Sequence, residues 1–211
     1  MRPSLRILAA LSALTGAFAL TLQYLLSTRL TTADGRGWLP GLWLCLGYFT
    51  ILTNLFCTVT LAAAAIAPQE RRGWLRHPGT ATAAAISIVI VALVYQVLLH
   101  ALWHPHGWAL LADLLLHRAM PLLFLLYWWL AVPKAALGWP QIGTWLLYPA
   151  AYFVYALARG AIDGWYPYPF LDVAHLGYAR VLLNACAMLL AFVTVALVLL
   201  VLSRWQHRRL G

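Results

Sequence analysis

Long apolar segments limit this chain to a small set of folds. A helix needs about 20 mostly apolar residues to cross the roughly 30 Å hydrocarbon core of a bilayer. Segments near this length occupy residues 5–27, 42–67, 80–103, 108–131, 141–160 and 174–203. Because spanning structures must satisfy their backbone groups internally, the sequence predicts an all-α integral membrane bundle of six transmembrane helices. We expect it to form a single domain over residues 1–211.

The composition of the chain argues against a soluble globular protein. Hydrophobic residues make up 64% of the chain and charged residues 9%, whereas soluble domains carry about 25% charged residues. The formal net charge of +9 does not indicate nucleic acid, because most basic residues lie between apolar segments, where they set topology. The three cysteines lie inside apolar segments without metal-ligand spacing. We interpret them as packing residues and expect no cofactor.

The distribution of Lys and Arg among the loops predicts how the bundle is oriented. One side carries Arg2, Arg6, Arg71, Arg72, Arg76, Lys134, Arg204, Arg208 and Arg209, and the other carries Arg29, Arg36, Arg159 and Arg180. The more basic side stays in the cytoplasm, so both termini are expected there. The first apolar run continues past a small-residue stretch at Ala17 to Ala19, so a retained helix is expected rather than a cleaved signal peptide.

A polar run from Gly47 to Asn54 interrupts the second apolar segment. Lipid offers no hydrogen-bond partner to Thr50, Thr53 and Asn54, so these side chains must face protein, a cavity or a substrate. Thr50 lies about eight residues, or roughly 12 Å, from the outer end of its helix. His117 lies at a similar depth in the fourth segment. The two side chains are therefore expected at one level of the membrane.

Further polar side chains are expected at this level. Asp113 precedes His117 by one helical turn on the same face, where it can accept a proton from the imidazole and fix its tautomer. The other polar candidates in the outer half are Asn54, Gln96, His100, Arg118 and Asn184. The cytoplasmic halves of the segments are apolar by comparison. This asymmetry predicts an outward-facing polar cavity rather than a pore.

Thr50 and His117 together offer a nucleophile and a base. A threonine hydroxyl attacks an acyl carbon when a base removes its proton, and neutral imidazole is suited to this near pH 7. Asp113 would orient the base, and a lipid-soluble ester would enter from the bilayer. The donors to the developing oxyanion would come from Asn54, Gln96, Arg118 or Asn184.

Each of these residues also has a purely structural explanation. Thr in a transmembrane helix commonly bonds the carbonyl four residues earlier, and His117 with Asp113 can simply lock its own helix. Arg118 can pair with Asp113 or Asp172, and the two asparagines can tie helices together. A histidine-rich edge around Pro105 can bind zinc in principle, but it lacks a metal-binding spacing, and we expect no metal.

Three motifs, taken in order, resemble those of one bacterial family. They are Tyr48-Phe49-Thr50-Ile51-Leu52-Thr53-Asn54, then Leu115-Leu116-His117 followed by Met120-Pro121, and Tyr166-Pro167-Tyr168-Pro169-Phe170-Leu171. Their order and spacing resemble the six-helix membrane proteins often called Pr-six-Pr, which are distantly similar to the eukaryotic androgen-induced proteins. The resemblance runs from the second segment to the start of the sixth. It implies a location in a bacterial inner membrane.

The resemblance also implies an activity. The eukaryotic relatives are threonine hydrolases of fatty acid esters of hydroxy fatty acids, and their threonine and histidine match Thr50 and His117. The spacing from His117 to Pro121 is one residue shorter here, and the outer-loop match adds Tyr168 to the candidate substrate-binding residues. We therefore expect a hydrolase of such fatty acyl esters. The alternatives are a non-catalytic lipid or small-molecule binding protein or transporter using the same cavity, and a structural membrane subunit.

Overall fold

The computed structural model describes residues 2–66, 73–102 and 104–210 of the chain, and within them it contains helices and no strand. The far ends of the second and third predicted segments, at residues 67 and 103, lie outside the described residues, as do Arg71 and Arg72. The all-helical expectation is confirmed for the described part of the chain.

The helices fall into two groups along the chain. The first half contains α1 (Pro3–Ala33), α2 (Trp38–Gly47), α3 (Phe49–Ile66), the 3-10 turn η1 (Trp74–Arg76), α4 (Pro78–Val94), the π-helical turn η2 (Tyr95–Leu99) and the 3-10 turn η3 (His100–Leu102). The second half contains α5 (Gly107–Leu114), the π-helical turn η4 (Leu115–Ala119), α6 (Met120–Ala131), α7 (Gln141–Trp145), α8 (Leu147–Asp163), the 3-10 turn η5 (Pro169–Leu171) and α9 (Val173–Leu210).

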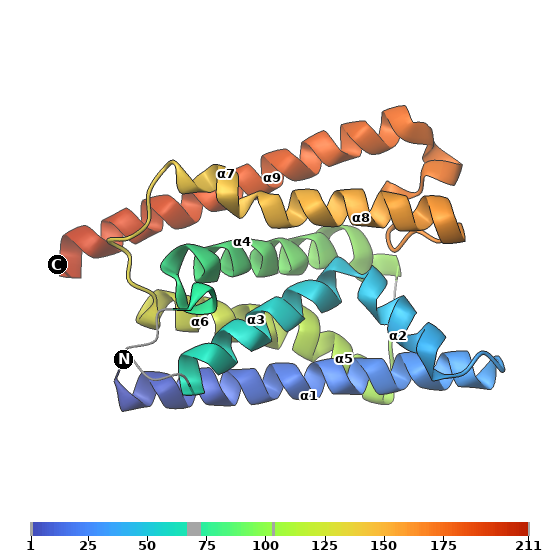
Figure 1. The fold of residues 1–211 in the computed structure, drawn as a ribbon, viewed down its shortest axis with the longest axis horizontal. Helices are drawn as coiled ribbons and strands as arrows, with labels where there is room; N and C mark the ends of the chain where they lie inside the picture. The colour runs from blue at the N-terminus through green and yellow to red at the C-terminus, as the bar shows by residue number, and fades with distance from the viewer. Residues whose placement is uncertain (1, 67–72, 103, 211) are drawn as a thin grey trace.

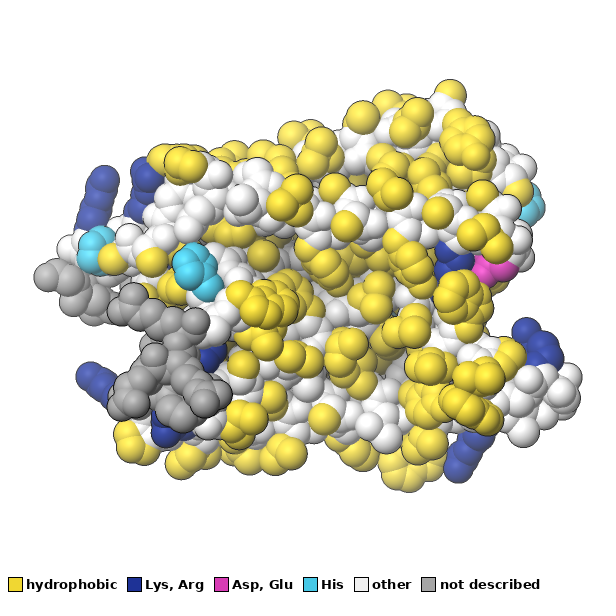
Figure 2. Space-filling view, viewed as in Figure 1, with side chains coloured by type: hydrophobic (Ala, Val, Ile, Leu, Met, Phe, Trp, Pro, Cys, Tyr) yellow, Lys and Arg dark blue, Asp and Glu magenta, His cyan; other side chains and the backbone are white. Residues whose placement is uncertain are grey.

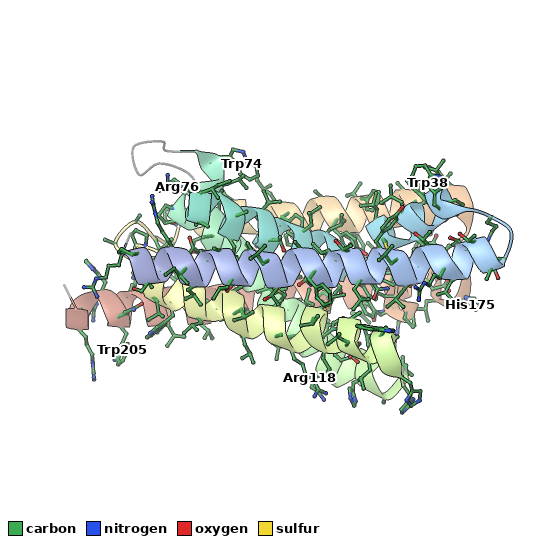
Figure 3. All side chains as sticks on the ribbon, turned by 90° about the horizontal axis from the view of Figure 1, so that it is seen from below. Trp38, Trp74, Arg76, Arg118, His175 and Trp205 are labelled. Atoms are coloured by element: carbon green, nitrogen blue, oxygen red, sulfur yellow. The ribbon has the colours of Figure 1, made fainter. Side chains whose placement is uncertain are left out.

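The helices form an elongated bundle in which α4 lies between α3 and α6 on one side and α9 on the other (Figure 1). The two ends of the chain lie at the same end of this bundle, which we call the terminal end; the opposite end, with the loops 34–37 and 164–172, is the distal end. Trp74 and Arg76 lie at the terminal end, and Trp38 and His175 lie at the distal end (Figure 3).

Five helical stretches of the described chain are long and apolar enough to cross a membrane. They are Pro3–Ala33, Phe49–Ile66, Pro78–Leu102, Gly107–Ala131 and Val173–Arg209. Large apolar side chains cover the visible side of the bundle between the ends, and Lys and Arg gather at the two ends (Figure 2). Ile162 and Leu122, for example, are 85% and 69% exposed. Such a surface is stable in lipid and not in water, which is compatible with a multi-pass membrane protein.

The second predicted segment is not one helix, which corrects the sequence-based expectation. The chain leaves the helix at Tyr48, whose backbone is extended at φ −88° and ψ 130°, between α2 and α3. Two tyrosine hydroxyls of α8 donate to carbonyls freed at the break: Tyr152 to Gly47 O at 2.9 Å and Tyr155 to Leu46 O at 3.2 Å. Broken helices occur inside membranes only where other protein groups satisfy the backbone in this way.

Other helix boundaries also differ from the sequence-based expectation. Helix α1 continues to Ala33 rather than ending at residue 27. The fifth segment divides into α7 and α8, and α8 has 17 residues. Helix α9 bends at Gly177, whose φ of 72° and ψ of 159° suit a residue without a side chain.

A buried arginine fixes the distal side of the break. Arg159 is 4% exposed, and its Nε donates to Asp163 Oδ2 at 3.2 Å. The centre of its guanidinium lies 4.2 Å from the ring centroid of Trp43 and 4.8 Å from that of Trp165. A Cβ atom on Gly47 would lie only 2.4 Å from Arg159 Nη1. The arginine therefore joins α2, α8 and the distal loop 164–172. Its contacts leave room only for glycine at position 47.

Candidate functional site

His117 and Asp113 form a partly enclosed pair where α5 passes into η4. His117 Nδ1 lies 3.2 Å from Asp113 Oδ1 and 3.1 Å from the backbone oxygen of Asp113, and the two side chains are 14% and 8% exposed. A carboxylate and a carbonyl accept hydrogen bonds but cannot donate them, so Nδ1 of the neutral imidazole carries the proton. Nε2 is then the unprotonated nitrogen and is available as a base. The contact expected from the one-turn spacing is present.

Tyr95 completes this pair from a neighbouring helix. Its hydroxyl donates to Asp113 Oδ2 at 2.7 Å, and its ring stacks on the His117 imidazole with centroids 3.8 Å apart and planes 16° apart. Asp113 therefore receives a donor on each carboxylate oxygen. Sequence reasoning missed Tyr95; its only signal was a hydroxyl-bearing aromatic beside Gln96 in the outer half of an apolar segment.

Two residues of this cluster lie in π-helical turns. Tyr95 begins η2, and His117 lies in the middle of η4. A π turn widens the helix and frees a carbonyl from the regular ladder, and such turns are frequent at functional sites. Asn54 uses one of these carbonyls: its Nδ2 donates to Leu116 O at 3.2 Å and to Thr50 O at 2.8 Å. Asn54 thus ties the helix of Thr50 to the turn of His117.

Thr50 lies in the first turn of α3, directly after the break. Its backbone N–H donates to the Tyr168 hydroxyl at 3.3 Å. Burial raises the pKa of Tyr168 above its ordinary value, so the phenol is neutral near pH 7 and its O–H remains a donor. Tyr168 therefore occupies the positive end of the α3 dipole.

An apolar hollow of about 80 Å³ lies beside these residues. Phe49, Tyr95 and Tyr168 form part of its wall, together with residues of α4, α8 and α9. The wall therefore includes the ring that stacks on His117 and the hydroxyl that contacts Thr50. Pockets for small molecules are likewise mostly lined by apolar and aromatic side chains.

Only some of the expected substrate-binding residues lie near Thr50. Gln96 and Arg118 are exposed, and Arg118 extends away from the bundle (Figure 3). Asn184 donates to Phe170 O at 2.9 Å and ties α9 to the distal loop. Both Asn54 N–H groups reach carbonyls, and its Oδ1 has no partner among the described residues. Of the five expected substrate-binding residues, Tyr168 and Asn54 contact Thr50.

Neither the histidine-rich edge nor Thr53 adds a chemical group to this cluster. His100 meets the Tyr95 ring edge-on, with centroids 5.8 Å apart. Among the described residues, no three His, Cys, Asp or Glu side chains are grouped so that they could hold a metal ion. The Thr53 hydroxyl bonds the Tyr148 hydroxyl at 3.0 Å, which is a contact between α3 and α8.

Comparisons with known proteins found no match to this chain among family models, curated proteins or solved structures.

Proposed function

We propose that this chain is an integral-membrane lipid-ester hydrolase in which Thr50 is the nucleophile, His117 the base and Asp113 the group that orients the base. The observation that carries the proposal is the His117–Asp113 contact, because it favours the tautomer with the proton on Nδ1 and leaves Nε2 as a proton acceptor. The resemblance to the Pr-six-Pr and androgen-induced proteins points to the same two residues.

The proposed reaction proceeds through an acyl-enzyme. Thr50 Oγ1 attacks the acyl carbon of the ester while His117 Nε2 takes the hydroxyl proton. The imidazolium returns that proton to the departing alcohol, and water, deprotonated by the same nitrogen, then releases the fatty acid. The Tyr168 O–H, beside Thr50, is the donor that best fits the developing oxyanion.

The apolar hollow suggests the substrate class. A chain of methylene groups entering from the bilayer gains contact with an almost wholly apolar wall. The ester would stop where Tyr95 and Tyr168 supply hydroxyls. Fatty acid esters of hydroxy fatty acids, or similar lipid esters, fit these requirements.

We further propose that α8 is a sixth transmembrane helix and that both termini lie in the cytoplasm of a bacterial cell. Helix α8 has 17 residues and lies alongside α9 in the bundle (Figure 1). An even number of passes agrees with two chain ends at one end of the bundle, and the excess of Lys and Arg favours the cytoplasm for that end.

The proposal is tested with purified protein in detergent and a fatty acid ester of a hydroxy fatty acid. We expect hydrolysis by the unchanged protein, and a loss of at least about a thousandfold in kcat/KM for Thr50→Ala and for His117→Ala. The matched control is Thr53→Ala, three positions later on the same helix, and we expect this variant to retain activity. Full activity in either site variant would refute the assignment.

Binding without turnover would instead favour the non-catalytic alternative. In that case the ester would bind to the purified protein, Thr50→Ala would not weaken binding, and no free fatty acid would form. Transport of the lipid into liposomes by the Thr50→Ala variant would identify a transporter that uses the same hollow.

A further inference from the structure

A second hollow lies at the terminal end of the bundle, away from the site described above. It has a volume of about 290 Å³ and lies between η1, the start of α4, α7 and the start of α8. Its wall includes His77, Gly79, Thr80, Thr144 and Trp145. Unlike the first hollow, it therefore carries several polar groups, and none of them takes part in the proposed hydrolysis.

Trp145 presents an unpaired donor in this hollow. The residue is 2% exposed, and its Nε1 has no hydrogen-bond partner among the described residues. A Cβ atom built on Gly79 would lie 3.5 Å from that nitrogen, so the indole N–H lies over the first turn of α4. Buried donors without a partner are rare, because no hydrogen bond offsets the free-energy cost of removing them from water. An acceptor placed beside the first turn of α4 would satisfy this one.

The start of α4 supplies further donors at the same place. The helix has 17 residues, and its first-turn N–H groups form the positive end of the helix dipole. His77 Nδ1 accepts from the Gly79 N–H at 3.1 Å, and the His77 carbonyl accepts from the Ala81 N–H. The Thr80 N–H between them remains available to a ligand. Because Nδ1 of His77 is an acceptor, its ring proton lies on Nε2, which is another donor.

The charge around the hollow favours an anion. No carboxylate lies among the described residues that line it, and Arg76 immediately precedes His77 at the same end of the bundle (Figure 3). Lys and Arg side chains project from this end in the space-filling view (Figure 2). Helix N-termini surrounded by N–H donors commonly bind phosphate.

We propose that the terminal hollow is a phosphate-binding site, formed by the Trp145 indole N–H and the first turn of α4. The phosphate comes from inorganic phosphate or from the headgroup of a phospholipid, whose phosphate lies at the level of a bundle end. The site does not include Thr50 or His117. Phosphate binding can therefore be tested separately from the proposed hydrolase activity.

The test measures the thermal unfolding temperature of the full-length protein in a neutral detergent. One arm compares sodium phosphate with sodium chloride at equal ionic strength. The other compares micelles containing phosphatidylglycerol with micelles containing diacylglycerol of the same chains. We expect a saturable rise of about 2–6 °C in at least one arm; a rise with phosphate identifies the free anion, and a rise with phosphatidylglycerol alone identifies the headgroup.

Two variants separate this site from general anion effects. Trp145→Phe removes the N–H together with part of the ring. Gly79→Ala keeps every donor but places a methyl group 3.1 Å from His77 Nδ1 and 3.5 Å from Trp145 Nε1. Both are expected to lose the rise, while Trp38→Phe at the distal end, 56% exposed, retains it. If Trp145→Phe does not fold, Gly79→Ala alone decides. The absence of a rise in both arms, or an equal rise in the Gly79→Ala variant, would overturn the proposal.

Discussion

Tyr95 has two contacts that act on His117 in different ways. Its ring limits the rotation of the imidazole through stacking at 3.8 Å, and its hydroxyl holds Asp113 at 2.7 Å, on the carboxylate oxygen opposite the one facing His117. The carboxylate is thereby fixed from two sides, and so is the imidazole. In the proposed reaction, Tyr95 is a positioning residue that acts through Asp113 and His117 rather than on the ester.

Replacing Tyr95 with phenylalanine separates the two contacts. Tyr95→Phe keeps the stacked ring and removes the hydroxyl, which is a donor to a charged group and is worth about 1.5–3 kcal/mol. We expect kcat/KM for ester hydrolysis to fall about tenfold or more, measured at a pH where the unchanged protein is fully active.

The control for this variant is Tyr178→Phe. Tyr178 is 61% exposed on α9, and the loss of its hydroxyl is expected to leave kcat/KM unchanged. Equal activity in Tyr95→Phe and the control would show that Asp113 is held well enough without Tyr95.

At the scale of the elements, three tyrosines from distant parts of the chain hold the α2–α3 break. Tyr152 and Tyr155 donate to carbonyls before the break, and Tyr168 accepts the Thr50 N–H after it. The break turns the first turn of α3, with Thr50, toward the distal loop. The nucleophile proposed here therefore lies at the start of a helix within the bundle rather than in the middle of a continuous one.

Helix α8 packs closely against the distal loop 164–172 at Gly160. A Cβ atom on Gly160 would lie 2.1 Å from Tyr166 Cε1 and 2.4 Å from Cζ, so Gly160→Ala must displace the ring. We expect the free energy of unfolding to fall by about 1–3 kcal/mol, measured by reversible denaturation in detergent. Gly143→Ala is the matched control, because nothing lies within 4 Å of that position. A fall of the same size in the control would contradict this account of the packing.

Local patterns in the sequence predicted the all-helical fold and the Asp113–His117 contact. Hydropathy is a local property, and residues one turn apart on a helix meet whatever surrounds them. The break at Tyr48 was not predictable, because the hydroxyls that stabilise it come from Tyr152 and Tyr155, more than a hundred positions later in the chain. Tyr95 was missed for the same reason, since its partners lie on another helix. Gln96 and Arg118 share the predicted depth but are exposed, because depth alone does not specify which face of a helix is buried.

On the scale of the whole molecule, the two ends of the bundle differ in chemistry. The distal half holds Asp113, His117 and the hollow beside them, whereas the terminal end carries both chain ends and the hollow at the start of α4. Apolar side chains cover the visible side of the bundle between the ends (Figure 2). An ester that reaches the site is therefore expected to arrive through the bilayer, and its polar product to leave toward the distal end.

The proposed orientation is tested by reporter fusions in a bacterial host. Green fluorescent protein fused after Gly211 should fluoresce, and alkaline phosphatase fused there should be inactive, because the phosphatase folds only outside the cytoplasm. Alkaline phosphatase inserted at Gly35, in the first distal loop, should be active. Active phosphatase at the C-terminus would contradict the proposed orientation.

Covalent labelling tests the central claim most directly. A fluorophosphonate is attacked by a hydroxyl nucleophile that has a base beside it, and mass spectrometry of peptides from the labelled protein identifies the residue that reacted. We predict a phosphonate on Thr50 in the unchanged protein and none in His117→Ala, with Thr53 unmodified in both. Label on a different residue, or equal labelling of Thr50 in His117→Ala, would contradict the assignment of Thr50 and His117 as nucleophile and base.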